Sequence, residues 1–188
     1  NTNTAATQFN WLQDDTKPTM TITATDGSNS VSSGDSTNDA TLTLTFTSNE
    51  ATSNFAVGDI SVSGGSLSNF ASSSTTVYTA TFTPTADGAT TIDVGAGGFS
   101  DAAGNTNTAA TQFTWTQDDT KPTMTITASQ GNSGLTSNDA ALSLTFTSNE
   151  TTSDFAVGDI SVSNCALSAF ASTSTAVYTA TCTATADG

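Results

Sequence analysis

Apolar and polar residues alternate in short stretches along the first 117 positions of the chain. In the stretch "TLTLTFT" at positions 41–47, leucine or phenylalanine stands at every second place and threonine fills the places between. This period of two, with β-branched polar partners, is typical of a strand that buries one face. Seven strands are predicted, at Met20, Ile22 and Ala24; Leu42, Leu44 and Phe46; Ile60 and Val62; residues 66–71; Tyr78, Ala80 and Phe82; Ile92 and Val94; and Phe113 and Trp115.

No segment shows the apolar period of about 3.6 residues that marks an amphipathic helix. Clusters of Gly, Asn, Asp and Ser separate the predicted strands at spacings expected of a β-sandwich. The predicted fold class is therefore all-β. Because the strands alternate in direction and their number is odd, the chain is expected to enter and leave each sandwich at opposite ends, as an end-to-end array requires.

The sequence contains an internal repeat. "DDTKPTMTITA" begins at Asp14 and again at Asp118, a shift of 104 residues, whereas from Asn49 onward the shift is 100, so the second copy has lost four residues near 26–38. The opening "NTNTAATQFNWLQDD" recurs from Asn105 as "NTNTAATQFTWTQDD". The predicted domains are the last strand of a preceding repeat at 1–13, a complete repeat at 14–117, and a repeat at 118–188 truncated before its last two strands.

Acidic residues far outnumber basic residues. The formal net charge is −15, the basic residues are Lys17 and Lys121, and there is no histidine. Binding to phosphate groups needs clustered Lys and Arg, so nucleic acids and anionic membranes are not expected partners. No run approaches the ~18 apolar residues of a membrane span, so no membrane insertion is expected in this segment.

Four motifs resemble a known family of repeats. "DDTKPTMTI", "FTSNEATSNFAVGDISVSGGSLSNF", "YTATFTPTADG" and "FSDAAGNTNTAAT" are similar to the bacterial immunoglobulin-like repeats of giant surface adhesins and biofilm-associated proteins. The resemblance covers essentially the whole chain and implies tandem immunoglobulin-like, seven-stranded β-sandwiches. It also implies a stalk or extender module at the cell surface, outside the cell, frequently stiffened by calcium between domains.

Three predicted loops with acidic side chains meet at one end of the sandwich if the strands alternate in direction. They are the entering linker, the loop at 48–59 and the loop at 98–105. Gathered like charges are destabilising unless a cation lies between them, and Ca²⁺ accepts about six to eight oxygen ligands in irregular geometry. The expected structural calcium ligands are Asp14, Asp15, Glu50, Asp59, Asp101 and Asn105 in the first repeat, and Asp118, Asp119, Glu150 and Asp159 in the second.

Glu50 and Glu150, the two glutamates of the chain, stand at equivalent places in the two repeats. A longer carboxylate arm can reach bidentately from one loop to an ion that shorter aspartates also hold. The alternative is that these acids are solvated turn residues, since Asp and Asn commonly bond their own backbone in turns.

The two cysteines occur in the same repeat. Cys165 aligns with Gly65 and Cys182 aligns with Phe82, on neighbouring predicted strands. We expect a disulfide between them, which fits an oxidising extracellular setting, with two free buried thiols as the alternative.

No catalytic constellation is visible, because the chain has no histidine or arginine and no cysteine paired with a base. An enzyme is therefore not expected. The leading hypothesis is an extracellular stalk or fibre whose partners are neighbouring repeats. The alternatives are an adhesin module that binds glycans or surfaces, and a self-assembling filament in which residues 1–13 complement another copy. Trp11 and Trp115, at equivalent places on the last strand, are expected in core or interdomain packing, with a sugar-stacking platform as the alternative.

Overall fold

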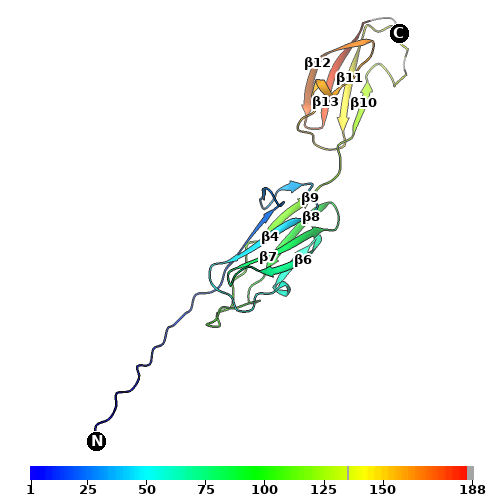
Figure 1. The fold of residues 1–188 in the computed structure, drawn as a ribbon. Helices are drawn as coiled ribbons and strands as arrows, with labels where there is room; N and C mark the ends of the chain where they lie inside the picture. Colours follow the sequence, from blue (N-terminus) through cyan, green and yellow to red (C-terminus); the bar gives the residue numbers. More distant parts are fainter. Residues whose placement is uncertain (135, 186–188) are drawn as a thin grey trace. The chain divides into compact units, whose positions relative to one another are not determined.

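The computed structural model describes residues 1–134 and 136–185. The chain divides into unit 1, Asn1–Asp119, and unit 2, Thr120–Gly188, and Figure 1 shows β-strands in both. The last three positions of the predicted 118–188 repeat lie outside the described residues. Residues 1–17 are exposed and form no strand, and the assignment of 1–13 to a preceding repeat stays a prediction.

Unit 1 is a sandwich of two sheets. The five-stranded sheet has the order β2 (Ser30–Val31), β1 (Met20–Thr25), β4 (Leu42–Ser48), β7 (Val77–Pro84) and β6 (Gly65–Ser72). The four-stranded sheet has the order β3 (Ser36–Thr37), β9 (Phe113–Gln117), β8 (Gly88–Val94) and β5 (Ile60–Ser63). The predicted all-β class is confirmed, and each of the seven predicted strands is present.

The short strands β2 and β3 were not predicted, because side-chain turns create them. Asp26 accepts hydrogen bonds from the amides of Ser28 and Asn29, both at 2.6 Å, and this turn folds β2 back onto β1. Asp35 Oδ2 then accepts the Ser32 amide at 2.7 Å before the chain crosses to β9, which β3 joins in parallel. Alternation of apolar residues carries no signal for such two-residue strands.

The core of unit 1 lies between the sheets. In β4, Leu42, Leu44 and Phe46 point inward and are fully buried, whereas the threonines between them face outward. Trp115 of β9 is also buried, and its Nε1–H donates a hydrogen bond to Thr37 Oγ1 at 3.0 Å. The burial of Trp115 leaves no ring face for a sugar, so its suggested role as a glycan platform is wrong.

Strand directions define two ends of unit 1. The pairs Met20↔Ser48 and Ile60↔Val94 place the start of β1, the loop 49–59 and the loop 95–112 at one end, called here the N-terminal pole. The pair Gly88↔Gln117 places the turn 85–87 and the end of β9 at the other, the C-terminal pole. The chain thus enters and leaves unit 1 at opposite poles, as the odd strand count predicts.

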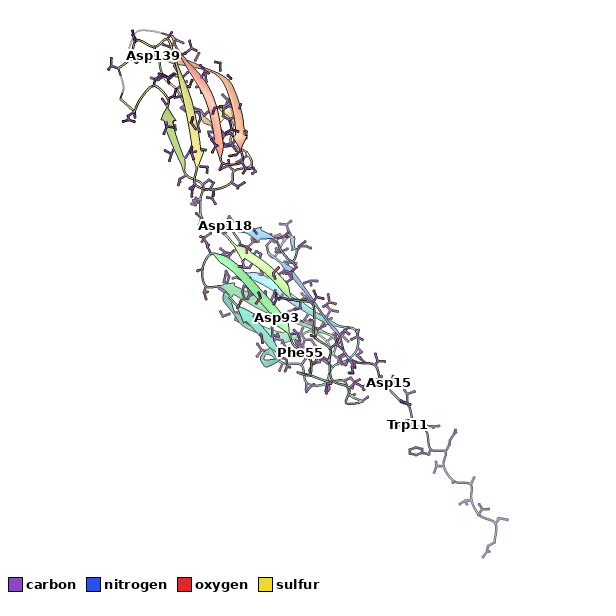
Figure 2. All side chains as sticks on the ribbon, turned by 180° about the vertical axis from the view of Figure 1, so that it is seen from behind. Trp11, Asp15, Phe55, Asp93, Asp118 and Asp139 are labelled. Atoms are coloured by element: carbon purple, nitrogen blue, oxygen red, sulfur yellow. A yellow bond between two sulfur atoms is a disulfide. The ribbon has the colours of Figure 1, made fainter. Side chains whose placement is uncertain are left out.

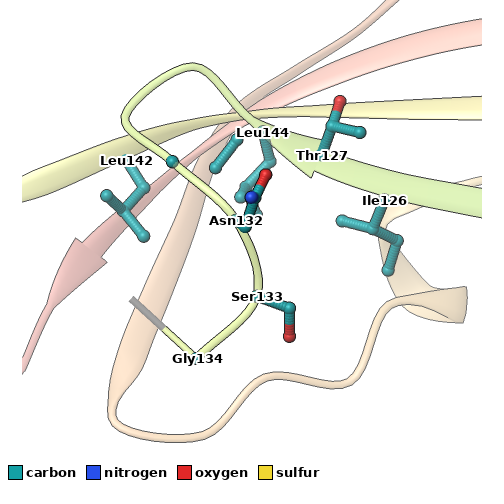
Figure 3. Close-up of a pocket in the computed structure, with 9 residues that line it drawn as sticks. Ile126, Thr127, Asn132, Ser133, Gly134, Leu142 and Leu144 are labelled. Atoms are coloured by element: carbon teal, nitrogen blue, oxygen red, sulfur yellow. The ribbon is translucent and has the colours of Figure 1, made fainter. Parts of the chain in front are cut away.

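Unit 2 contains the counterpart of the first sheet. Its four strands have the order β10 (Met124–Ala128), β11 (Ala141–Ser148), β13 (Val177–Ala184) and β12 (Cys165–Ser174). Within the described part of this unit there is no second sheet. Ile126, Leu142 and Leu144 line an open pocket, which Figure 3 shows together with Asn132, Ser133 and Gly134.

A disulfide joins β12 and β13. Cys165 and Cys182 are bonded, and their Cα atoms are 5.6 Å apart. The equivalent pair in unit 1 is Gly65 and Phe82, where a Cβ added at Gly65 would lie 2.3 Å from Phe82 Cζ. At the positions of the two cysteines, unit 1 instead packs the Phe82 ring against the backbone of Gly65.

Candidate metal centre

Three acidic side chains from distant parts of the sequence converge at the N-terminal pole. Asp14 lies in the entering segment, Glu50 follows β4, and Asp101 lies in the loop after β8. Each offers a carboxylate oxygen, and the three oxygens all lie within 4.8 Å of one another. The group, called here the acidic triad, combines one residue from each of the three segments that sequence reasoning placed at this end.

Asp101 is held rigidly by its own loop. It is only 5% exposed, and its Oδ1 accepts hydrogen bonds from the amides of Gly104 (2.7 Å) and Asn105 (2.8 Å). Its Oδ2 accepts a third bond from Asn105 Nδ2 at 2.8 Å. These bonds, that from the Asn105 side chain first, lower the pKa of Asp101 below its ordinary 3.8, against the opposing effect of burial. Asp101 therefore carries a negative charge at neutral pH.

Asparagine side chains tie the entering segment to both loops. Asn105 Nδ2 also donates to the carbonyl oxygen of Asp14 at 3.0 Å. Asn49 Oδ1 accepts a hydrogen bond from the backbone amide of Thr19 at 2.6 Å. The backbone amide of Asn49 donates in return to the Thr19 carbonyl oxygen at 3.2 Å. Asp14 thus enters the triad from a backbone that is bonded at Asp14 itself and again at Thr19, five residues later.

The two loops are also joined to each other. Asn54 Oδ1 accepts the Ser100 amide at 2.8 Å, and the rings of Phe55 and Phe99 meet edge-on with centroids 4.9 Å apart. Figure 2 places Phe55 inside unit 1, toward the end that the segment bearing Asp15 enters. Because both rings are buried, the hydrophobic core itself sets the separation of Glu50 and Asp101.

Glu50 is the unsatisfied member of the triad. Its Oε1 is buried and has no hydrogen-bond partner among the described residues. Burial raises the pKa of Glu50 above its ordinary 4.5, and the charges of Asp14 and Asp101 raise it further. A buried carboxylate oxygen without a donor is unfavourable, and a cation beside it would remove that cost.

The donor set fits a hard cation. The triad offers carboxylate oxygens, with no sulfur and no imidazole, and this is the chemistry that Ca²⁺ prefers over the transition metals. The structure thus contains the two features such a site needs, which are converging negative charge and an oxygen that no donor from the described part of the chain reaches.

The other expected ligands of unit 1 lie outside the triad. Asp59 Oδ2 accepts the Ala56 amide at 2.9 Å and so closes the short 3₁₀ turn η1 (Val57–Asp59). Asn105 acts through its amide nitrogen, as a brace for Asp101 and the linker. Asp15, which follows Asp14 directly, is exposed and is not part of the group.

Unit 2 repeats part of this arrangement. Glu150 Oε1 is again buried without a hydrogen-bond partner among the described residues. Asn149 Oδ1 accepts the Thr123 amide at 2.6 Å, as Asn49 does with Thr19. Asp159, like Asp59, uses Oδ2 to accept the amide of the alanine three residues before it, at 2.9 Å.

Asp118 and Asp119 both belong to unit 1. The Asp118 amide donates to the Thr37 carbonyl at 3.0 Å, and the Asp119 amide donates to Asp87 Oδ1 at 3.1 Å. The placement of Asp119 beside Asp87 was not predicted, because the repeat alignment assigns the whole pair to the domain that follows it.

Sequence reasoning missed the asparagine braces Asn49 and Asn54. A signal for Asn49 exists in the alignment, because the residue before each glutamate is Asn in both copies, at 49 and at 149. For Asn54 there is none, since the second copy has Asp154 at that place.

The comparison with family models agrees with this architecture. The chain matches the bacterial Ig-like domain over residues 14–116 and again over residues 118–188. It belongs to the bacterial Ig-like domain family. The resemblance inferred from the sequence motifs is thereby confirmed. No curated protein and no solved structure matches the chain.

Bacterial Ig-like domains are structural, non-catalytic modules that typically occur in surface or extracellular proteins. Membership of this family indicates a repeat or stalk role for this chain. The Cys165–Cys182 disulfide is consistent with an oxidising compartment. Across the described residues, no helix is long and apolar enough to cross a membrane.

Proposed function

We propose that this chain is a segment of an extracellular adhesin stalk, in which tandem bacterial Ig-like domains are stiffened by calcium at the end where each domain is entered. One observation carries the proposal. Three carboxylates from three separate segments converge within 4.8 Å, and one of their oxygens is buried with no protein partner.

The acidic triad would hold the ion, and each member would have a different part. Asp101 is the fixed ligand, because three hydrogen bonds already orient it. Glu50 supplies the buried oxygen that lacks a donor. Asp14 belongs to the entering segment, so its attachment to the ion would fasten that segment to the loops of the domain.

Charge explains why the ion would change stiffness. Without a cation, the negative charges of Asp14 and Asp101 repel the Glu50 carboxylate, which the raised pKa of Glu50 reflects. A divalent cation converts this repulsion into attraction between the entering segment and the body of the domain. The fold does not depend on the ion, because the core is made by the two sheets.

The neighbouring repeats of the same chain are the proposed partners. In an array of this kind, the free energy of unfolding is close to a sum of two contributions. One is the stability of each domain, and the other is the interaction energy between neighbouring domains. Calcium would act mainly at the junction between neighbouring domains, and so it would set the flexibility of the stalk, while the sandwich that holds the ion would gain the stability that ion binding supplies.

Calcium binding is tested first by titration calorimetry on the full chain. We expect binding by the intact protein and a loss of affinity in Glu50→Gln, which keeps the size of the side chain and removes its charge. Asp26→Asn is the matched control, because Asp26 closes a turn next to the far end of β1. Equal affinity of Glu50→Gln and the intact protein would contradict the proposal.

Stiffness is tested by small-angle scattering on a chain in which a copy of 14–117 replaces residues 1–13. The replacement keeps the natural join, since 1–13 repeats 105–117 with few changes. Chelation should increase flexibility without melting the sandwiches. Scattering curves that coincide with and without chelator would refute calcium bracing and would leave only the stalk role.

A further inference from the structure

Residues 9–13 repeat the sequence of a strand that lies inside unit 1. The stretch "FNWLQ" at 9–13 corresponds to "FTWTQ" of β9, in which the first, third and fifth side chains are buried. At the same positions of 9–13, Phe9 is 89% exposed and Trp11 is 76% exposed. The segment 9–13, called here the donor strand, thus keeps the apolar pattern of a core strand although its aromatic side chains are exposed.

Unit 2 contains the face that a strand of this kind covers in unit 1. Leu42 and Leu44 are fully buried beneath the second sheet of unit 1, which includes β9. Their counterparts Leu142 and Leu144 are only half-buried. Together with Ile126 they line the open pocket of about 400 Å³ that Figure 3 shows. The surface formed by these three residues of unit 2 is called here the acceptor face.

A second pocket of unit 2 corresponds to the place of the Trp115 ring. In unit 1, Trp115 packs edge-on against Phe82, with ring centroids 6.1 Å apart. The counterpart of Phe82 is Cys182, whose disulfide lines a pocket of about 240 Å³ together with Leu142. This pocket is the position at which the Trp11 ring of a bound donor strand would lie.

Unit 2 also contains the hydrogen-bond acceptor for the indole. Trp115 Nε1–H donates to Thr37 Oγ1 at 3.0 Å, and Thr37 Oγ1 donates in turn to Asp39 Oδ2 at 2.6 Å. Ser137 Oγ donates to Asp139 Oδ2 in the same way, and it accepts the backbone amide of Asp139 at 3.0 Å. A hydroxyl oxygen has two acceptor lone pairs, so the second one can accept an indole N–H.

The segment that binds the backbone of β9 recurs in unit 2 as well. The Gly34 amide donates to the Thr114 carbonyl at 2.8 Å, and the Asp118 amide donates to the Thr37 carbonyl at 3.0 Å. Gly34 has a φ of 96° and its counterpart Gly134 has a φ of 84°, so both adopt the left-handed conformation. Unit 2 thus keeps the local backbone conformation from which unit 1 binds β9.

We propose that the donor strand of one copy of this chain binds the acceptor face of a second copy. Phe9 and Trp11 would insert against the sheet of unit 2, and Ser137 would accept the indole N–H. Donation of a strand to an open sheet is a known mode of recognition between proteins. The proposal goes beyond the stalk role and does not rest on calcium binding at the acidic triad.

The repeat gives this contact a direction. The donor strand leads into unit 1 through "DDTKPT", and β9 leads into unit 2 through the same six residues. Unit 1 of the donor would therefore follow unit 2 of the acceptor through the sequence that joins the two units within one chain. Copies would add head to tail and continue the array without a covalent bond.

The size of the contact predicts reversible association. Two aromatic side chains bury about 150–250 Å² each, which is less than the about 800 Å² per partner of a typical stable complex. In unit 1, β9 also pairs with β8 along its other edge. In the described part of unit 2 no counterpart of β8 is present, so that edge of the donor strand would stay unpaired. We therefore expect a mass that rises with protein concentration.

Sedimentation velocity on the full chain, from micromolar to millimolar concentration, tests the donor side. Trp11→Thr should raise the dissociation constant by about thirtyfold or more, as expected for a tryptophan at the centre of an interface. Leu12→Thr is the matched control, because Leu12 is also exposed but corresponds to Thr116, whose side chain lies between the inward-facing positions of β9. This control should associate like the intact chain.

Substitutions in unit 2 test the acceptor side. Ile126→Lys places a charge on the acceptor face and should abolish association. Its control is Thr125→Lys, since the neighbouring side chain of β10 points to the opposite face. Ser137→Ala removes the indole acceptor and should weaken association by about fivefold or more. Hydrogen exchange of β11 and β13 checks the folding of unit 2, and Ser137→Ala decides the acceptor side if Ile126→Lys disturbs it.

A mixing experiment tests the direction of the contact. Trp11→Thr keeps an intact acceptor face, and Ile126→Lys keeps an intact donor strand. Each variant alone should remain a monomer, whereas the mixture should form a heterodimer and no larger species. In place of Ile126→Lys, the Ser137→Ala variant should give a heterodimer that is about fivefold weaker.

The other outcomes overturn the proposal. An intact chain that stays a monomer up to millimolar concentration shows that the donor strand does not bind a second copy. Association that Trp11→Thr leaves unchanged indicates contact between two acceptor faces, and association that Ile126→Lys and Ser137→Ala leave unchanged indicates contact between two donor strands. Equal losses in Trp11→Thr and Leu12→Thr indicate unspecific apolar adhesion.

Discussion

Unit 1 and unit 2 build the same first sheet and bury it to different extents. The registers are equivalent, with Met20 opposite Ser48 in unit 1 and Met124 opposite Ser148 in unit 2. Ile126, however, is 59% exposed on the face that unit 1 covers with its second sheet. The same register thus occurs on a face that is buried in unit 1 and largely exposed in the described part of unit 2.

The N-terminal ends of the two first sheets are nearly the same. The rings of Phe55 and Tyr78 lie 4.9 Å apart, as do those of Phe155 and Tyr178. This aromatic cluster thus forms in unit 2 in the absence of a second sheet among the described residues. In both units this cluster anchors the glutamate loop to the first sheet.

The far ends of the two sheets differ in chemistry. Unit 1 packs Phe82 against Trp115, with ring centroids 6.1 Å apart, over the bare backbone of Gly65. Unit 2 has a disulfide at these positions. A covalent bond between neighbouring strands thus stands where unit 1 has aromatic packing.

Removal of the phenylalanine ring at the centre of the aromatic cluster, Phe55 or Phe155, should have the largest effect on stability. It should also distinguish the two units most clearly. Phe55→Ala should destabilise unit 1 by about 3–5 kcal/mol, whereas Phe155→Ala should cost less because Phe155 is only half-buried. Urea unfolding followed by Trp115 fluorescence reports unit 1, and hydrogen exchange of β11 and β13 reports unit 2. Phe9→Ala, at a residue 89% exposed, is the control. Equal costs in the two units would contradict the comparison.

Reduction of the disulfide should affect unit 2 alone. The bond joins residues 17 positions apart, and closing a loop of this length stabilises by about 3 kcal/mol in the chain-entropy model. Hydrogen exchange should quicken in β12 and β13 after reduction and stay unchanged in unit 1. A similar acceleration in both units would show that the effect comes from the reductant.

A methyl group at Gly65 tests the packing that the disulfide replaces. Gly65→Ala places a Cβ 2.3 Å from Phe82 Cζ, and such overpacking should cost about 1–3 kcal/mol. Gly95→Ala is the matched control, because a Cβ there meets nothing within 4 Å. In a Phe82→Ala background the cost of Gly65→Ala should largely disappear, which a double-mutant cycle measures. Additive costs would refute the contact.

The smallest effect expected is a change in the pH dependence of stability through Glu50. The folded state without calcium binds this proton more tightly than the unfolded chain, because the pKa of Glu50 is raised above 4.5. Its contribution to stability is complete below the unfolded pKa and declines as the pH rises through the folded pKa. In chelator, Glu50→Gln should therefore melt higher than the intact protein near neutral pH and equally near pH 4.

Calcium should reverse that order. With saturating Ca²⁺ the intact protein keeps a ligand that Glu50→Gln lacks, so the intact protein should melt at the higher temperature. Melting curves recorded between pH 4 and pH 8, with and without calcium, check both statements. If Glu50→Gln melted above the intact protein in calcium as well as in chelator, the titration of Glu50 alone would explain the difference. That result would contradict calcium binding by Glu50.

Much of the fold could be predicted from the alternation of apolar and polar residues. Strands such as β4 and β7 carry apolar residues at every second place, and counting strand directions was enough to bring the loops of Glu50 and Asp101 to one end. The structure extends this result to contact between side chains, since three carboxylate oxygens meet. Alternation works for β4 and β7 because each of these strands has one buried face.

The remaining features depend on contacts that alternation does not encode. Asp59 Oδ2 closes the 3₁₀ turn through the Ala56 amide, a role that alternation does not predict, and its expected role as a calcium ligand stays a prediction. Gln117 was not singled out from the sequence, although it occupies an inward-facing position two residues after Trp115. Its burial requires the parallel pairing of β9 with β3, a strand of two residues that leaves no mark in the pattern.

The opposite positions of the chain's entry and exit have a mechanical consequence. β1 begins at one pole and β9 ends at the other, and β1 is bonded to β4 along its whole length, from Met20 to Thr25. A pulling force applied through the two ends of the domain acts along the strands, and it loads these bonds together in shear. A domain under tension then yields only when the ladder breaks as a whole, because no strand can be peeled away one bond at a time.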